Sequence, residues 1–135
     1  MSVDLAIQLR EGTQKSHTMA ENTGFVSCFL KGVVDKTSYR DLVADFYFVY
    51  SAMEDALEKL AAEEHPVISP IFFPELHRRE SLKEDLIFYY GPNWQESIHP
   101  TPAAKIYVDR IKTVAEQSPA LLIGHHYARY IGDLS

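Results

Sequence analysis

The chain has 135 residues, enough for one domain with a substantial core, and its 46% hydrophobic content argues against intrinsic disorder. The formal net charge of −6 makes nucleic acid an unfavourable partner, because binding to phosphates requires a basic surface. No uncharged apolar run reaches the roughly 18 residues that a membrane-spanning helix needs. A single cysteine, Cys28, excludes an internal disulfide, and its position between phenylalanines predicts a small core residue.

Helical periodicity dominates the first half of the sequence, where a helix is predicted over residues 3–22. A second helix is predicted over residues 38–60, with Ser38 as its N-cap and His65-Pro66 as the signal that ends it. Apolar side chains recur there every three or four positions and predict one buried face: Tyr39, Leu42, Val43, Phe46, Tyr50, Met53, Leu57 and Leu60. The three prolines of residues 65–76 then predict an irregular connection.

Three further helix starts follow in the second half of the chain. The segment "SLKE" (Ser81 to Glu84) has the spacing of a capping box, and its helix runs into Gly91-Pro92. In Thr101-Pro102 and Ser118-Pro119, a capping residue precedes a proline that suits the first helical position. No segment alternates with a period of two, so no sheet is expected. The sequence therefore predicts an all-α fold with five or six helices.

The first predicted helix carries one narrow polar stripe, because residues at i, i+4, i+7 and i+11 share a face. Its members are Arg10, Gln14, His17 and Glu21, flanked by the small residues Thr13 and Ala20, which leave room for a bulky group. Two interpretations are open: a solvated face, or a ligand site. In the second, His17 binds a metal through one ring nitrogen, and Glu21 accepts a hydrogen bond from the other.

A single histidine ligand is unlike a zinc site, which takes three or four protein ligands, but it is what a haem iron uses. Arg10 lies about two helical turns from His17 and suits an anionic group of the same ligand.

The last twelve residues, "GHHYARYIGDLS", combine glycines, histidines and charges within a helical pattern. His125 and His126 point about 100° apart on a helix, so they are not expected to bind one metal ion. Arg129, Gly132 and Asp133 share a face. Glycine within a helix costs about 1 kcal/mol, so Gly132 indicates a kink or a close approach of backbone to a ligand, unless it is simply a helix C-cap.

Basic residues gather in "LHRRESLK", which contains Arg78, Arg79 and Lys83. This group is either a landing site for an acidic electron donor or a solvated helix start.

Several motifs resemble those of the haem oxygenase family along nearly the whole chain: "LREGTQKSHTMAEN", "FFPEL", "DLIFYYGPNW" and "HYARYIGDLS". Two more, "CFLKG" and "PTPAAKIYVDRIK", are most similar to its cyanobacterial and plastid members, which implies a cytoplasmic or plastid-stromal location. The family's motif continues past "GDLS". The resemblance therefore implies that residues 1–135 are the N-terminal part of a single haem oxygenase domain, cut within the distal helix, and that this part need not be active by itself.

The resemblance also implies roles for individual residues in a fold that holds haem between two helices. His17 matches the proximal iron ligand and Glu21 its hydrogen-bonding partner, while Arg10 and Tyr127 match residues that contact the propionates, with Thr13 beside them. Gly132 matches the glycine whose backbone approaches iron-bound dioxygen. Asp133, with Arg129 and Tyr50, matches the group that orders water beside that oxygen.

The implied reaction cleaves haem at its α-meso carbon to biliverdin IXα, carbon monoxide and ferrous iron. Haem is then both substrate and cofactor, dioxygen is the oxidant, ferredoxin is the expected electron donor, and the product feeds phycobilin synthesis. A distal aspartate acting through water is suited to deliver protons to bound dioxygen. Two alternatives remain: a haem-binding carrier without turnover, and a helical relative that binds no haem.

Overall fold

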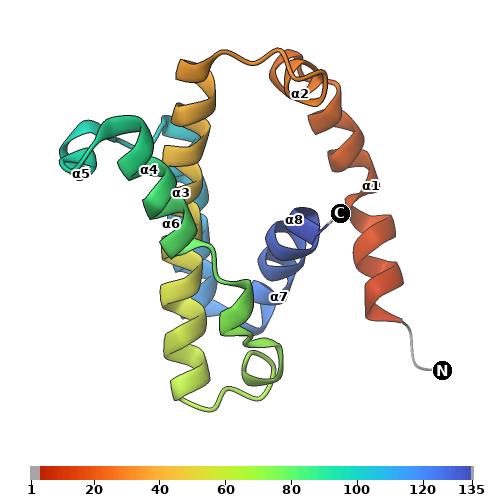
Figure 1. Cartoon of the computed structure of the whole chain (residues 1–135). Helices are drawn as coiled ribbons and strands as arrows, with labels where there is room; N and C mark the ends of the chain where they lie inside the picture. The colour runs from red at the N-terminus through yellow and green to blue at the C-terminus, as the bar shows by residue number, and fades with distance from the viewer. Residues whose placement is uncertain (1–3, 135) are drawn as a thin grey trace. The chain divides into compact units, whose positions relative to one another are not determined.

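A computed structural model describes residues 4–134, and the all-α prediction is confirmed over this range, which contains no strand. Its elements, labelled in Figure 1, are α1 (Leu5–Glu21), α2 (Gly24–Leu30), α3 (Lys36–Ala62), η1 (Ser69–Ile71), η2 (Pro74–Leu76), α4 (Arg79–Tyr90), α5 (Trp94–Ser97), α6 (Pro102–Gln117), η3 (Pro119–Leu121), α7 (Leu122–His126), η4 (Tyr127–Ile131) and α8 (Gly132–Leu134). The short helices α2 and α5 were not indicated by the sequence pattern. The chain forms two compact units, Met1–Tyr39 and Arg40–Ser135, and each is described by itself.

The first unit contains α1 and α2, close to the helix predicted over residues 3–22. The Asp4 side chain caps α1 by accepting a hydrogen bond from the backbone N–H of Ala6 at 2.9 Å. In α2, the ring of Phe29 stacks on that of Phe25, with centroids 6.4 Å apart. Cys28 is exposed, so the prediction of a core cysteine is wrong. The phenylalanines beside it are exposed too, Phe25 at 39% and Phe29 at 45%, so α2 has no buried face that Cys28 could join.

The start of α3 differs from the prediction by a few residues. The helix begins at Lys36, because the carboxylate of Asp35 accepts hydrogen bonds from the Ser38 backbone N–H at 2.7 Å and from its hydroxyl at 3.2 Å. These hydrogen bonds lower the pKa of Asp35. Asp35 therefore does the capping that was assigned to Ser38, and Ser38 lies inside the helix.

Helix α3 supplies most of the core of the second unit. Its buried residues are Val43, Ala44, Val49, Tyr50, Ala52, Met53, Glu54, Leu57 and Leu60. Five of the eight predicted core positions, Val43, Tyr50, Met53, Leu57 and Leu60, are thus fully buried, and the other three are half-buried. Glu54 is the exception among these apolar side chains.

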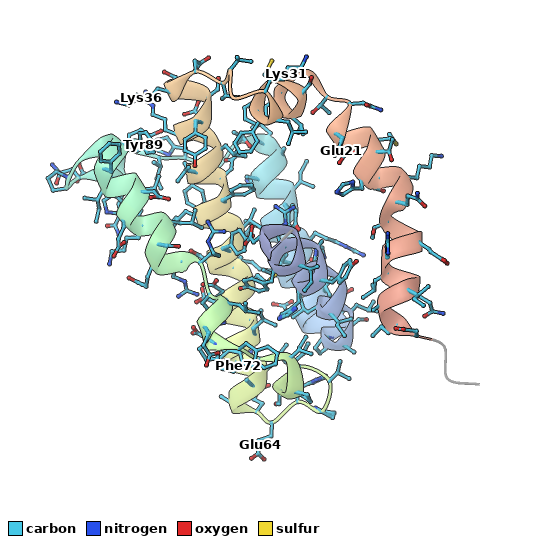
Figure 2. All side chains as sticks on the ribbon, turned by 45° about the vertical axis from the view of Figure 1, so that its right-hand side comes forward. Glu21, Lys31, Lys36, Glu64, Phe72 and Tyr89 are labelled. Carbon is cyan, nitrogen blue, oxygen red and sulfur yellow. The ribbon has the colours of Figure 1, made fainter. Side chains whose placement is uncertain are left out.

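The far end of α3 matches the predicted stop before His65-Pro66. The helix ends at Ala62, and Glu64 turns the chain with a positive φ of 57° while its side chain points away from the molecule (Figure 2). The ring nitrogen Nδ1 of His65 then accepts hydrogen bonds from the backbone N–H groups of Val67 and Ile68. Ile68 is completely buried and anchors the irregular connection.

Helices α4 and α6 lie beside α3 (Figure 1), and hydrogen bonds from α3 fix the starts of both. For α6 the predicted start is confirmed: Thr101 accepts from the N–H of Ala104 at 3.2 Å, and Pro102 occupies the first turn. Asp45 of α3 accepts in turn from the Thr101 N–H at 3.0 Å and from its hydroxyl at 2.6 Å.

For α4 the predicted start at Ser81 is wrong. The helix begins at Arg79, and its first N–H groups are capped by a side chain from α3. The carboxylate of Glu54 accepts from the N–H of Arg78 at 2.5 Å and from that of Arg79 at 3.2 Å. The predicted end is confirmed, because Gly91 stops the helix with a φ of 85°. Among the helices of the described chain, none combines the length and the apolarity needed to cross a membrane.

Candidate functional site

The segment after Ser118 changes its helical form three times before residue 134. A 3₁₀ turn, η3, leads into α7, followed by the π-helical turn η4 over Tyr127–Ile131 and then by α8. π turns are rare and are frequent at functional sites. Within η4, Tyr130 is buried and Tyr127 is half-buried. The segment that the sequence singled out is therefore an irregular helix.

Gly132 follows the π turn directly. Its backbone is right-handed helical, with φ −57° and ψ −40°, and α8 continues from it. The C-cap interpretation is therefore wrong, because a C-capping glycine adopts the left-handed conformation. A Cβ at this position would meet no atom within 4 Å among the described residues. Packing among the described residues therefore does not require glycine at this position.

Tyr50, Arg78 and Asp133 form a cluster, here called the carboxylate cluster. The hydroxyl of Tyr50 donates to Asp133 Oδ2 at 2.7 Å, and Arg78 Nη1 lies 2.9 Å from the same oxygen. Burial, then the hydrogen bond to Asp133 and its negative charge, raise the pKa of Tyr50 well above its ordinary value. The phenol therefore keeps its proton and donates, while Asp133 accepts. Both contacts use Oδ2, which leaves Oδ1 for water.

Arg129 joins this cluster through its backbone. Its carbonyl oxygen lies 3.4 Å from the Tyr50 hydroxyl as a second acceptor. Its guanidinium packs over the rings of Phe46 at 5.6 Å and Tyr107 at 5.9 Å. The buried Nε of Arg129 has no hydrogen-bond partner in the described part of the chain. The structure thus brings Tyr50, Arg129 and Asp133 together, as their assignment to one group expected.

Arg78 was missed as a member of the cluster, because the sequence placed it in a basic group with Arg79 and Lys83. Arg78 pairs with Asp133, and Arg79 pairs with Asp55 at 2.6 Å. Lys83 lies 3.9 Å from Glu80 on the same helix. The solvated helix start is therefore wrong for the two arginines, whose charges are matched by carboxylates of the same unit, while the landing site for an acidic electron donor stays a prediction.

The polar stripe of α1 lies in the first unit, and its four members are exposed. His17 Nδ1 is 3.3 Å from Glu21 Oε1, with side chains 73% and 51% exposed. When Nδ1 faces a carboxylate, the other ring nitrogen, Nε2, is left to bind a metal. Arg10 lies two turns earlier, and Thr13 donates its hydroxyl to the Leu9 carbonyl at 2.7 Å. The structure therefore brings His17 and Glu21 together on one exposed face of α1, and the binding of a metal by His17 stays a prediction.

The neighbouring histidines of α7 pack against aromatic rings. The His125 ring lies 5.5 Å from that of Tyr107, and the His126 ring lies 4.9 Å from that of Tyr130. Burial lowers the pKa of both histidines, which favours their neutral forms. No three His, Cys, Asp or Glu side chains gather as a metal-binding group within residues 4–134.

The described residues form an all-α fold with a histidine–glutamate pair on one helix and a tyrosine–aspartate pair beside a π turn. The sequence profile described as "Heme oxygenase" matches residues 3–135. The chain belongs to the haem oxygenase family.

Individual relatives agree with this assignment. The chain is 59% identical over 135 residues to "Heme oxygenase 1" of Synechocystis sp., covering 100% of this chain and 55% of the relative. It is 57% identical over 132 residues to "Heme oxygenase" of Rhodella violacea, covering 98% and 55%. Among solved structures, Synechocystis heme oxygenase-1 in complex with heme matches with a TM-score of 0.93 and 59% identity, over 98% of this chain and 59% of that one. The chain spans about half the length of the curated relatives it matches.

Proposed function

We propose that this chain belongs to an enzyme that cleaves haem at the α-meso carbon to biliverdin IXα, carbon monoxide and ferrous iron, with dioxygen as the oxidant. The observation that carries the proposal is the hydrogen bond from Tyr50 to Asp133, next to the open backbone of Gly132. The match to one family over residues 3–135 supports treating these residues as part of a single domain. Two similar structures are titled as complexes with heme, which supports haem as the ligand.

For haem binding we propose His17 as the iron ligand, through Nε2. Its Nδ1 faces Glu21, which fixes the ring and makes the imidazole a better donor. Arg10 and Tyr127 are assigned to the propionates, and Thr13 to the haem-facing side of α1. When bound, haem supplies the iron centre that activates dioxygen and the ring that is cleaved.

For proton delivery we propose the carboxylate cluster. Asp133 holds a water through Oδ1, because Tyr50 and Arg78 contact Oδ2. Tyr50 stays protonated and keeps the carboxylate oriented. Gly132 presents backbone without a side chain, so a ligand can approach closely there. The backbone carbonyl of Arg129 lies 3.4 Å from the Tyr50 hydroxyl, a weaker second acceptor beside Asp133.

The expected electron donor is ferredoxin, and the expected use of the product is phycobilin synthesis. The support is the similarity to "Heme oxygenase 1" proteins from Synechocystis and Nostoc, at 59% and 57% identity. Biliverdin release with reduced ferredoxin, compared with release with ascorbate alone, tests the donor separately from the chemistry.

In a protein that carries this chain at the full length of its relatives, added haem is expected to give a Soret band, and reduction in air is expected to release biliverdin. Absorption spectra followed over time measure both steps. A Soret band without biliverdin contradicts the enzymatic proposal and favours a haem carrier. The absence of a Soret band contradicts haem binding altogether and favours a helical relative without haem.

Replacing Asp133 by alanine is expected to leave haem affinity unchanged and to lower the rate of biliverdin release by about a hundredfold, the scale of a lost proton-transfer group. The measurement is product formation with ascorbate, beside a haem titration of the same variant. Asp85→Ala, an exposed aspartate on α4, is the matched control and should behave as wild type. Wild-type yield from Asp133→Ala removes Asp133 from the mechanism.

A further inference from the structure

Asp133 receives its two protein contacts from two different parts of the second unit. Tyr50 lies in the middle of α3, and Arg78 lies directly before α4. A carboxylate held by one hydrogen bond can still rotate about that bond, whereas two donors on one oxygen define where the other oxygen points. The contact to Arg78 is an ion pair, with Nη1 2.9 Å from Oδ2, so it adds the attraction of opposite charges to the hydrogen bond from Tyr50. Arg78 is therefore the second of two constraints on the direction of Oδ1.

A flexible arginine fixes another group only if it is fixed itself, because ordering its side chain costs conformational entropy. The backbone N–H of Arg78 donates to Glu54 Oε1 at 2.5 Å, and its guanidinium lies 5.7 Å from the centre of the Tyr50 ring. Glu54 is only 1% exposed, so this carboxylate is itself held rigidly. The backbone of Arg78 is thus anchored by Glu54, and its side chain packs over the Tyr50 ring and contacts Asp133.

The same buried carboxylate also holds the π turn. The hydroxyl of Tyr130 donates to Glu54 Oε1 at 2.9 Å. Burial and the charge of Glu54 raise the pKa of Tyr130, so that phenol remains a donor. One carboxylate of α3 therefore holds both Arg78, directly before α4, and the segment that leads to Asp133.

We propose that Arg78 is a positioning residue for Asp133, anchored by Glu54, and that it fixes the direction in which Asp133 presents its free oxygen. The proposal rests on the proposed function for its effect on turnover. The contacts on which it stands are those of Arg78 with Asp133, with Tyr50 and, through its backbone, with Glu54.

The first experiment compares Arg78→Met, which removes the charge, with Arg78→Lys, which keeps it. Haem affinity is expected to stay at the wild-type value in both, because Arg78 acts on Asp133 and not on the iron ligand. Biliverdin release should fall about ten- to a hundredfold in Arg78→Met, the scale of a misplaced catalytic group, and recover in part in Arg78→Lys. Ascorbate is the reductant, so that loss of a donor-binding charge does not enter the result.

Lys83→Met is the matched control, because it removes one positive charge from the same helix without touching Asp133. It should turn over haem at the wild-type rate. Wild-type turnover in Arg78→Met, or an equal loss in Lys83→Met, overturns the proposal.

A second measurement needs no haem. Hydrogen–deuterium exchange of the amides in residues 127–133 of the haem-free chain is expected to become about three- to tenfold faster in Arg78→Met than in Lys83→Met, since the segment loses one of its ties. Unchanged exchange overturns the positioning role. If the wild-type protein at the full length of its relatives releases no biliverdin, the proposed function fails, and exchange still decides whether Arg78 holds this segment.

Discussion

Replacing His17 by alanine is expected to abolish the Soret spectrum of a histidine-ligated haem and to weaken haem binding by at least about a hundredfold, since even partners of a metal ligand contribute ten- to a hundredfold to affinity. The physical reason is local. His17 Nδ1 lies 3.3 Å from Glu21 Oε1, which leaves Nε2 to bind the iron, and alanine offers no donor in its place. A haem titration followed by absorption gives both the spectrum and the affinity.

Two controls sharpen this result. His99→Ala removes an exposed histidine from a loop and should leave the titration unchanged. Free imidazole added to His17→Ala should restore the ligated spectrum in part, because it supplies the missing donor without the rest of the side chain. If His17→Ala binds haem with the wild-type spectrum and affinity, the assignment of the iron ligand is wrong.

The second large effect is expected from Glu54→Ala, on stability. The carboxylate is 1% exposed and accepts from the N–H groups of Arg78 and Arg79 and from the hydroxyl of Tyr130. Alanine leaves these donors without their acceptor in a buried place. At about 1–3 kcal/mol for each unsatisfied donor, the free energy of unfolding should fall by roughly 3 kcal/mol or more.

Denaturant unfolding followed by circular dichroism measures this change. Glu54→Gln keeps the shape and one acceptor oxygen, so it should lose less than Glu54→Ala. Glu84→Ala, an exposed glutamate on α4, is the control and should change stability by no more than about 0.5 kcal/mol. A Glu54→Ala variant as stable as this control contradicts the idea that the buried carboxylate joins α3, α4 and the π turn.

The fold could be predicted from sequence wherever the signal was local. The period of apolar residues located α3, and the capping residue with its proline located the start of α6 at Thr101-Pro102. The start of α4 was misplaced because its cap is Glu54, 24 residues away from Arg78 in sequence. A capping side chain from another helix cannot be recognised in the residues around the helix start. The local capping-box pattern therefore predicted a start at Ser81.

The candidate site divides in the same way. The motifs pointed to His17, Glu21 and Asp133, because each lies in a quoted segment that resembles the family, whereas Tyr50 was assigned from the resemblance as a whole. Arg78 lies outside the motifs that resemble the family. Only the folded chain places it against Asp133.

The sequence contains one signal for Glu54, the carboxylate that anchors Arg78. Glu54 lies four residues after Tyr50 and three before Leu57, which puts a carboxylate on the buried face of α3. A buried charge requires partners, and that requirement predicts donors nearby.

The π turn at Tyr127–Ile131 changes the direction of the side chains that follow it. A π turn adds one residue to a helix without lengthening its path in proportion, so every side chain beyond it is advanced by about 100° around the axis. In an uninterrupted α-helix, the same residues would direct the Asp133 carboxylate toward a different face of the helix. The extra residue rotates Asp133 around the helix axis. Its carboxylate then accepts the hydrogen bond from the hydroxyl of Tyr50, 83 positions earlier in the sequence.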